Sequence, residues 1–337
     1  MGRASAPAGD RVRVALGAME THEQPPGDPP APGMVWVPGG TFTMGSEKHY
    51  PEEKPCGPVS VDGFWMDETA VTNRQFAEFV RETGYVTTAE RAPDPAMYPG
   101  ADPSMLVPGS ITFVKPRGPV SLDNPMQWWA WTPGAQWRHP WGPSSNLDGK
   151  EDHPVTQVTY EDADAYARWA GKELPSEVQW ERAGRGGIEG AEFAWGDEIA
   201  PGGEERMNRW IGEFPWKFRP RPGGPRKPGT VPVKTFEPNP FGLYEITGNA
   251  WEWTRTWYAD HHPEPTSRCC APANPMGPGA DASRDPASGI PRKVIKGGSF
   301  LCAENYCSRY RPSSRIPESI ESSTCHISFR CVVSASA

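Results

Sequence analysis

A short apolar strand runs into a glycine pair and then into two cysteines, and this order restricts the local backbone to a sharp turn followed by a loop. Residues 294–295 are typical of the end of a buried strand, while Gly297 and Gly298 allow a turn or the close approach of another segment. Cys302 and Cys307 follow directly. On a helix, their five-residue step would turn about 140° beyond one full turn, so the thiols would diverge. We therefore expect a loop in which the two thiols converge.

Two converging thiols allow several kinds of chemistry. They can form a disulfide, bind a soft metal, or act as a nucleophile and a resolving thiol. Within this segment only two cysteines, Cys302 and Cys307, lie close together, which suits Cu(I) with two sulfur ligands better than zinc with four. Ser299 and Tyr306 add hydroxyl groups beside the thiols. On spacing alone, an inert buried thiol pair or a structural disulfide remains an alternative.

The rest of the chain is rich in residues that interrupt regular structure. Of the 337 residues, 36 are glycine and 41 are proline, which favours turns and loops. The chain also has 15 Trp, 12 Phe and 9 Tyr residues, enough large side chains to build a core. We therefore expect an irregular, loop-rich α+β fold, with a disordered Pro-, Gly- and Ala-rich tail over residues 1–33 and one domain over residues 34–337.

Capping signals mark three expected helices. A Thr or Ser followed three residues later by Gln or Asp predicts helices that start after Thr72, Thr159 and Ser176. Gly84 and Gly171 are expected to end the first two, because glycine readily adopts the left-handed conformation of a helix end.

Strands are expected near the N-terminus of the domain. Alternating apolar residues predict two strands around a Pro-Gly-Gly turn in residues 34–45, and another over residues 59–66. Residues 87–154 and 186–231 show no sustained pattern, so we expect them to be long irregular segments.

Charge and hydropathy argue against some partners. The 42 acidic residues outnumber the 34 basic ones, for a net charge of −8, which is unlike a general nucleic-acid binder. No stretch approaches the roughly 20 apolar residues that span a membrane, and residues 12–19 are too short and polar for a signal-peptide core. Seven cysteines, an odd number, argue against a full disulfide framework. We expect a cytoplasmic monomer with reduced thiols.

The cysteine segment resembles the active-site signature of the formylglycine-generating enzymes, the sulfatase-modifying factor family. The matching residues are Lys296-Gly-Gly-Ser-Phe-Leu-Cys302 and, after four residues, Cys307-Ser-Arg-Tyr-Arg311. Other segments match in the family's order: Trp137-Arg-His-Pro140, Asp152-His-Pro-Val155, Trp169-Ala-Gly-Lys-Glu-Leu-Pro175, Gly242-Leu-Tyr-Glu-Ile-Thr-Gly-Asn-Ala-Trp-Glu-Trp253 and Phe329-Arg-Cys331. The resemblance extends over residues 34–333, and the cysteine segment is its most specific part.

This resemblance implies a fold and an activity. The fold is the formylglycine-generating-enzyme variant of the C-type-lectin-like fold. The activity is the oxidation, with O2 and a reductant, of the cysteine in a Cys-x-Pro-x-Arg segment of a sulfatase polypeptide to Cα-formylglycine. By resemblance, Cys302 and Cys307 would hold Cu(I), and Ser299, Tyr306 and Trp251 would complete the catalytic site.

The resemblance also implies structural calcium, which takes oxygen ligands from carboxylates and backbone carbonyls. The implied ligands of one ion are the side chains of Glu245 and Glu252 and the carbonyls of Gly248 and Ala250. A second ion would be bound by Asn208 and by the carbonyl of Arg209. Its downstream acid would fall within residues 221–229, where the sequence has no acid.

Other functions remain to be distinguished. A related thiol oxygenase that uses non-haem iron would carry clustered histidines in a separate helical domain, whereas the seven histidines here are scattered. A non-catalytic C-type-lectin-like binding module would have no need of the cysteine pair. A structural zinc site is a further alternative, with Cys302, Cys307, Cys325 and Cys331 as its ligands.

Overall fold

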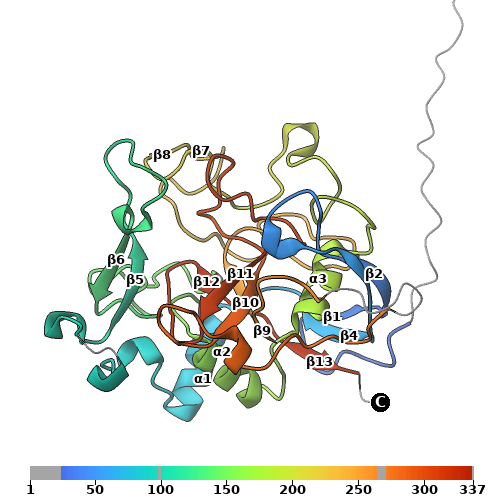
Figure 1. Cartoon of the computed structure of the whole chain (residues 1–337), viewed down its shortest axis with the longest axis horizontal. Helices are drawn as coiled ribbons and strands as arrows, with labels where there is room; N and C mark the ends of the chain where they lie inside the picture. The colour runs from blue at the N-terminus through green and yellow to red at the C-terminus, as the bar shows by residue number, and fades with distance from the viewer. Residues whose placement is uncertain (1–23, 98–99, 264–270, 336–337) are drawn as a thin grey trace, which may run out of the picture.

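The computed structural model describes residues 24–97, 100–263 and 271–335, so residues 1–23 of the expected tail lie outside the described residues. The α-helices are α1 (Asn73–Thr83), α2 (Tyr160–Trp169) and α3 (Glu177–Arg185). The strands are β1 (Met34–Val37), β2 (Gly40–Met44), β3 (Gly57–Val61), β4 (Phe64–Asp67), β5 (Gly109–Phe113), β6 (Trp129–Pro133), β7 (Gly212–Glu213), β8 (Lys217–Phe218), β9 (Trp251–Trp257), β10 (Arg292–Lys296), β11 (Arg315–Ser319), β12 (Ile327–Ser328) and β13 (Val332–Ser334). Short 3-10 helices include η1 (Pro51–Glu53) and η5 (Pro125–Gln127). Long loops connect these elements, as the glycine and proline content predicts (Figure 1).

All three α-helices begin at the predicted capping residues. The Thr72 hydroxyl accepts the Gln75 backbone N–H at 3.3 Å, and the Gln75 side-chain oxygen accepts the Thr72 backbone N–H at 2.8 Å. Thr159 and Ser176 cap α2 and α3 in the same way. Gly84 ends α1 with a φ of 68°, a left-handed conformation that favours glycine. In the described part of the chain, no helix is long and apolar enough to cross a membrane.

Two central sheets organise the strands. One has the order β1-β4-β13 and the other β11-β10-β9-β12. Neighbouring strands are antiparallel, except that β12 runs parallel to β9. Three two-stranded sheets, β2-β3, β5-β6 and β7-β8, complete the arrangement, and β5-β6 lies at one side of the molecule in Figure 1.

Two expectations about strands were wrong because distant pairing overrides the local pattern. Residues 59–66 do not form one strand: β3 and β4 are separated at residues 62–63, since β3 pairs with β2 while β4 pairs with β1 and β13. Residues 87–154 and 186–231 are not uniformly irregular either, because they contain the β5-β6 and β7-β8 hairpins. Phe113 at the end of β5 packs in an aromatic cluster with Trp210 and Phe214, a contact that no local signal reveals.

Helix α3 connects the core of the domain to the cysteine segment. It packs against β9 and β10 of the four-stranded sheet and against the β2-β3 pair. Its apolar residues Val178 and Trp180 join the hydrophobic core, yet Glu177, Glu181 and Arg185 on the same helix are also buried. Buried charges need charged partners nearby, and the end of β10 supplies one of them in Lys296.

Candidate active site

The two thiols of the cysteine segment converge, as the sequence predicts. Residues 297–314 join β10 to β11, and within them the Sγ atoms of Cys302 and Cys307 lie 3.1 Å apart. The loop is closed by hydrogen bonds from the Cys302 N–H to the Ser299 carbonyl at 2.9 Å and from the Cys307 N–H to the Ala303 carbonyl at 2.8 Å. Cys302 is buried and Cys307 is half-buried, and neither is in a disulfide.

The glycine pair before the cysteines is required by close backbone contacts. Gly297 and Gly298 have φ values of 94° and 73°. A Cβ on Gly297 would lie 2.9 Å from the carbonyl oxygen of Ile246, and a Cβ on Gly298 would lie 2.8 Å from that of Arg309. Both positions therefore combine a left-handed conformation with a contact too short for any side chain. This turn brings the start of the loop against Arg309, two residues after Cys307.

The thiols form part of the wall of a pocket of about 410 Å³. Ser299, Tyr306 and Trp251, which the resemblance implies as catalytic residues, all line the same pocket. Leu301 and Arg309 of the cysteine segment and His326 also line it. The remaining wall comes from distant residues that the sequence motifs do not connect with the site: Ile111, Pro125, Met126, Trp128, Trp129, Phe214, Ile316, Glu318, Ser322 and Thr324. Of these, Ile316 and Glu318 follow the two-residue alternation of a strand, which is the one local signal that predicts a shared face.

The aromatic wall of the pocket fixes the position of Tyr306. Its ring stacks on Phe214 with 4.6 Å between ring centroids and an angle of 6° between planes. It also meets Trp128 edge-on at 5.4 Å. Ser299, near the start of the cysteine loop, is fully buried, and its hydroxyl accepts the Leu301 N–H at 3.2 Å. Both hydroxyl-bearing residues are thus held by the protein before any substrate binds.

The two thiols differ in acidity. Burial raises the pKa of Cys302, and its hydrogen bond with Cys307 raises it further. The hydrogen bond from Cys302 lowers the pKa of Cys307 to about 7, against burial and with help from the positive charge of Arg309. Cys307 is therefore the thiolate of the pair near neutral pH, and Cys302 donates to it. Two sulfur atoms arranged in this way are a soft ligand pair of the kind that binds Cu(I).

Arginines on the cysteine segment tie it to the N-terminal part of the domain. Arg309 donates to Glu52 at 2.6 Å and lies 3.6 Å from the ring centroid of Tyr50. The Tyr50 hydroxyl accepts the backbone N–H of Ser308 at 3.1 Å. Arg311 donates to the Ser308 carbonyl at 2.9 Å. The residue directly after Cys307 is therefore held through both its N–H and its carbonyl.

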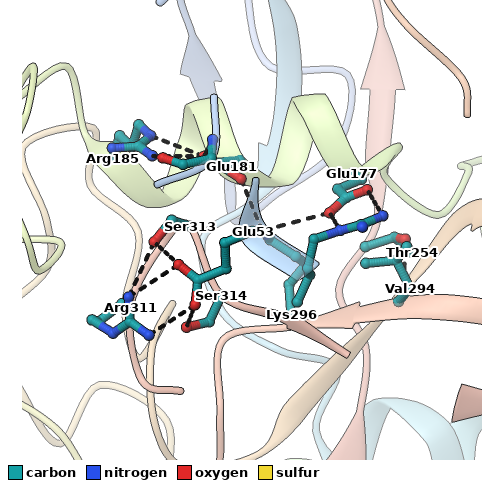
Figure 2. Close-up of polar contacts among 12 residues, drawn as sticks. Glu53, Glu177, Glu181, Arg185, Thr254, Val294, Lys296, Arg311, Ser313 and Ser314 are labelled. Carbon is teal, nitrogen blue, oxygen red and sulfur yellow. Dashed lines mark hydrogen bonds and ion pairs between the residues drawn. The ribbon is translucent and has the colours of Figure 1, made fainter. Parts of the chain in front are cut away.

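Beneath this segment lies a buried network of charges, which Figure 2 shows. Arg311 pairs with Glu53 of η1, with 2.8 Å between Nη2 and Oε1. Lys296 at the end of β10 pairs with Glu181 of α3, with 2.9 Å between Nζ and Oε2. Arg185 binds the same carboxylate at 2.7 Å. Burial raises the pKa of Glu181, but Lys296 and Arg185 outweigh it and hold that pKa at about 2.

The carboxylates implied as calcium ligands are occupied by other partners. Both oxygens of Glu252 accept hydrogen bonds from Arg330, and one also accepts the Trp180 indole N–H at 2.7 Å. Glu245 accepts the backbone N–H groups of Lys234 and Phe236. The lone pairs of Glu252 are thus used by a guanidinium and an indole, which a calcium ion at that carboxylate would have to displace. The calcium at this place stays a prediction, which a chelator-dependent melting temperature would support.

At the second implied calcium site, the side chains of Asn208 and Arg209 act as donors. The Asn208 side-chain N–H groups donate to the Gly229 carbonyl and to Asn249. Arg209 forms ion pairs with Glu205 and Glu304. Among the described residues, no group of three or more His, Cys, Asp or Glu side chains is arranged to hold a metal ion.

Comparison with known proteins places the chain in a family. Residues 19–335 match the model of the sulfatase-modifying factor enzyme 1-like domain. A formylglycine-generating enzyme from Mycobacterium tuberculosis is 48% identical over 301 residues, covering 89% of this chain and 97% of that protein. A mouse protein described as inactive C-alpha-formylglycine-generating enzyme 2 is 33% identical over 90% of this chain and 86% of its own length. The chain belongs to the sulfatase-modifying factor enzyme family.

The fold is also similar to that of a solved structure with low sequence identity. The structure of PvdO from Pseudomonas aeruginosa has a TM-score of 0.58 and 18% identity, covering 90% of this chain and 94% of that one. The predicted fold class is therefore confirmed: a loop-rich α+β domain of the formylglycine-generating-enzyme type, within the C-type-lectin-like folds. Because the family includes a member described as inactive, the activity of this chain has to be argued from its own site.

Proposed function

We propose that this chain converts the cysteine of a Cys-x-Pro-x-Arg segment in a sulfatase polypeptide to Cα-formylglycine, using O2 and a reductant. The observation that carries the proposal is the pair of sulfur atoms of Cys302 and Cys307, 3.1 Å apart in the wall of a pocket. A non-catalytic binding module has no use for such a pair. The 48% identical relative described as a formylglycine-generating enzyme supports the same assignment.

The cysteine pair fits a Cu(I) ion as part of this proposal. Cys307, with its pKa held at about 7, provides a thiolate near neutral pH. Cys302 reaches the thiolate form when a metal displaces its proton, which is the usual coupling between thiol ionisation and metal binding. When bound, Cu(I) would supply the centre at which O2 and the substrate sulfur react. Zinc and non-haem iron fit less well, because the described residues offer no further cluster of ligands at the pair.

The residues around the thiols would orient the substrate. Tyr306 is 38% exposed, so its hydroxyl-bearing ring can be reached from the pocket while Phe214 and Trp128 hold it in place. Ser299 presents a hydroxyl within the turn that contains Cys302. Trp251 is buried at the start of β9 and closes the inner wall. In our proposal these three side chains position the substrate cysteine and exclude water around it.

The free cysteine thiols bear on the compartment in which the protein acts. Cys56, Cys302, Cys307, Cys325 and Cys331 are free in the structure. We propose that the protein acts as a monomer in the cytoplasm, where reductants maintain thiols and can supply electrons to the reaction. Gel filtration tests the monomer, and thiol titration of freshly isolated, denatured protein under non-reducing conditions tests the compartment.

The experiment that tests the proposed function is mass spectrometry of a peptide. A peptide containing Cys-x-Pro-x-Arg is incubated with the protein, Cu(I), O2 and reductant, and a matched peptide with serine in place of the cysteine serves as the control. We expect the mass change of aldehyde formation only in the cysteine peptide, with the product trapped by a hydrazine reagent. An unchanged cysteine peptide would refute the activity.

A further inference from the structure

An acidic side chain without a cationic partner lines the thiol pocket. Glu318 lies on β11 two residues after Ile316, and the alternation of the strand turns both side chains into the pocket that contains Cys302 and Cys307. The Glu318 carboxylate interacts with the Ser322 hydroxyl and with the backbone of Ser319. Within the described residues it has no ion pair, unlike the buried acids beneath the cysteine segment. A carboxylate in this position is available to a ligand.

The nearest cation in the strand pairing is directed elsewhere. Lys293 of β10 is the cross-strand neighbour of Glu318. Its Nζ atom donates to the Arg255 carbonyl at 2.6 Å and lies 3.3 Å from the ring centroid of Trp257. The cation in the pocket wall, Arg309, is paired with Glu52. Neither cation neutralises Glu318.

The remaining titratable groups of the pocket hold their protonation states near neutral pH. Burial lowers the pKa of His326 to about 3, so its imidazole is neutral. Burial raises the pKa of Tyr306, so its hydroxyl keeps its proton. Burial raises the pKa of Glu318 to about 7, with Ser322 and Ser319 opposing the shift. Apart from the two cysteines, Glu318 is therefore the described pocket residue whose protonation changes near neutral pH.

The proposed reaction requires such a group. A free cysteine thiol has a pKa of about 8.5, and it must lose its proton before the sulfur can act as a metal ligand. We propose that Glu318 accepts the proton of the substrate cysteine thiol as that cysteine enters the pocket. The S–H bond breaks with its electron pair left on sulfur, and the proton forms an O–H bond with the carboxylate, directly or through one water. This inference rests on the proposed function and adds a proton acceptor to it.

The protonated product of this transfer suits its surroundings. Loss of water around the half-buried Glu318 carboxylate disfavours its charged form, so the pocket stabilises Glu318 once it has taken up the proton. The negative charge moves to the substrate sulfur, where the proposed metal ion and the guanidinium of Arg309 in the pocket wall would stabilise it. The proton transfer thus leaves the negative charge on the substrate sulfur, which is the atom that reacts.

The test compares pH profiles of the copper-loaded parent and of Glu318→Gln, which keeps the shape and removes the titration. With a Cys-x-Pro-x-Arg peptide, kcat/KM of Glu318→Gln should fall about 100-fold at pH 7 and recover toward the parent value above about pH 8.5, where the substrate thiol ionises unaided. Glu318→Asp should retain part of the activity at pH 7. A Glu318→Gln profile that matches the parent, or that is lowered equally at every pH, would overturn the proposal.

The rate of thiolate binding provides a readout that does not depend on turnover. In the absence of O2, binding of the peptide sulfur to the copper-loaded parent at about pH 7, followed by stopped-flow spectroscopy, should be about 100-fold faster than binding to Glu318→Gln, because Glu318 accepts the thiol proton. Equal binding rates for both proteins would also overturn the proposal.

A second variant keeps the inference falsifiable if Glu318→Gln does not fold. Ser322→Ala removes the hydroxyl that lowers the pKa of Glu318, so the acidic limb of the kcat/KM profile should move to higher pH. An unmoved limb would count against Glu318. Glu82→Gln, an exposed acid on α1, is the charge-matched control and should retain the parent profile. If the parent itself forms no formylglycine, the proposed function fails and not merely this inference.

Discussion

A substitution in the buried ion pair of Glu53 and Arg311 should cause one of the largest losses in the free energy of unfolding of this protein. Glu53 is fully buried and accepts hydrogen bonds from Arg311 Nη1 at 3.1 Å, from Arg311 Nη2 at 2.8 Å and from the Ser313 hydroxyl at 2.8 Å. In Glu53→Gln the side chain keeps its shape, but the guanidinium loses its counter-charge in a site that water does not reach. Breaking one side of a buried pair costs about 3–5 kcal/mol.

The expected loss is large enough to measure by thermal unfolding. At about 2 °C for each kcal/mol, the lower end for a chain of this length, Glu53→Gln should lower Tm by about 6–10 °C. Chemical denaturation should give the same loss in the free energy of unfolding. The double variant Glu53→Gln/Arg311→Met should recover part of that loss, because it removes the unpaired charge.

An exposed pair provides the matched control. Glu78 and Arg81 on α1 form an ion pair at 3.2 Å with side chains that are 52% and 69% exposed. Glu78→Gln should cost less than about 0.5 kcal/mol, since water screens both charges. If Glu53→Gln lowers the free energy of unfolding no more than Glu78→Gln does, the claim that the buried charge network is desolvated and holds the cysteine segment is refuted.

Three further predictions concern the loop and its supports. Cys302→Ser and Cys307→Ser should each abolish tight Cu(I) binding in a competition titration with a chelator, whereas Ser299→Ala should bind copper normally and turn over more slowly. Gly298→Ala should cost about 1–3 kcal/mol in the free energy of unfolding and weaken copper binding, because the new Cβ meets the Arg309 carbonyl. Glu181, whose pKa falls from 4.5 to about 2 on folding, should stabilise the protein above about pH 4.5 by on the order of 3 kcal/mol, and this contribution should be lost as the pH falls toward 2. Urea unfolding of the parent and of Glu181→Gln at several pH values measures how the free energy of unfolding depends on pH. Parallel pH dependences for the two proteins would contradict the stabilising role of Glu181.

The parts of the fold that depend on neighbouring residues were predictable from the sequence. The capping boxes at Thr72, Thr159 and Ser176 satisfy backbone N–H groups within four residues, so their pattern alone locates the helix starts. The convergence of Cys302 and Cys307 was predictable for the same reason, because a glycine turn and a five-residue spacing act locally.

The parts that depend on distant pairing were not predictable. β12 joins the edge of β9 in parallel, and β13 completes a sheet with β4, some 260 residues earlier in the chain. Glu53 reaches the cysteine segment from a similar distance. Glu318 carries no motif, and its place in the pocket depends on the pairing of β11 with β10. Such contacts are selected by the packing of the whole core rather than by local preference.

The central claim is that the two sulfur atoms of Cys302 and Cys307 form a copper site that oxidises a substrate cysteine. The most direct measurement is aldehyde formation in a Cys-x-Pro-x-Arg peptide, followed by mass spectrometry while Cu(I) is titrated into rigorously copper-free protein in the presence of O2. We predict that product formation rises with copper and levels off at about one Cu(I) per chain, as expected for a single site with two thiolate ligands. Full activity in the copper-free protein, or in Cys307→Ser, would contradict this account.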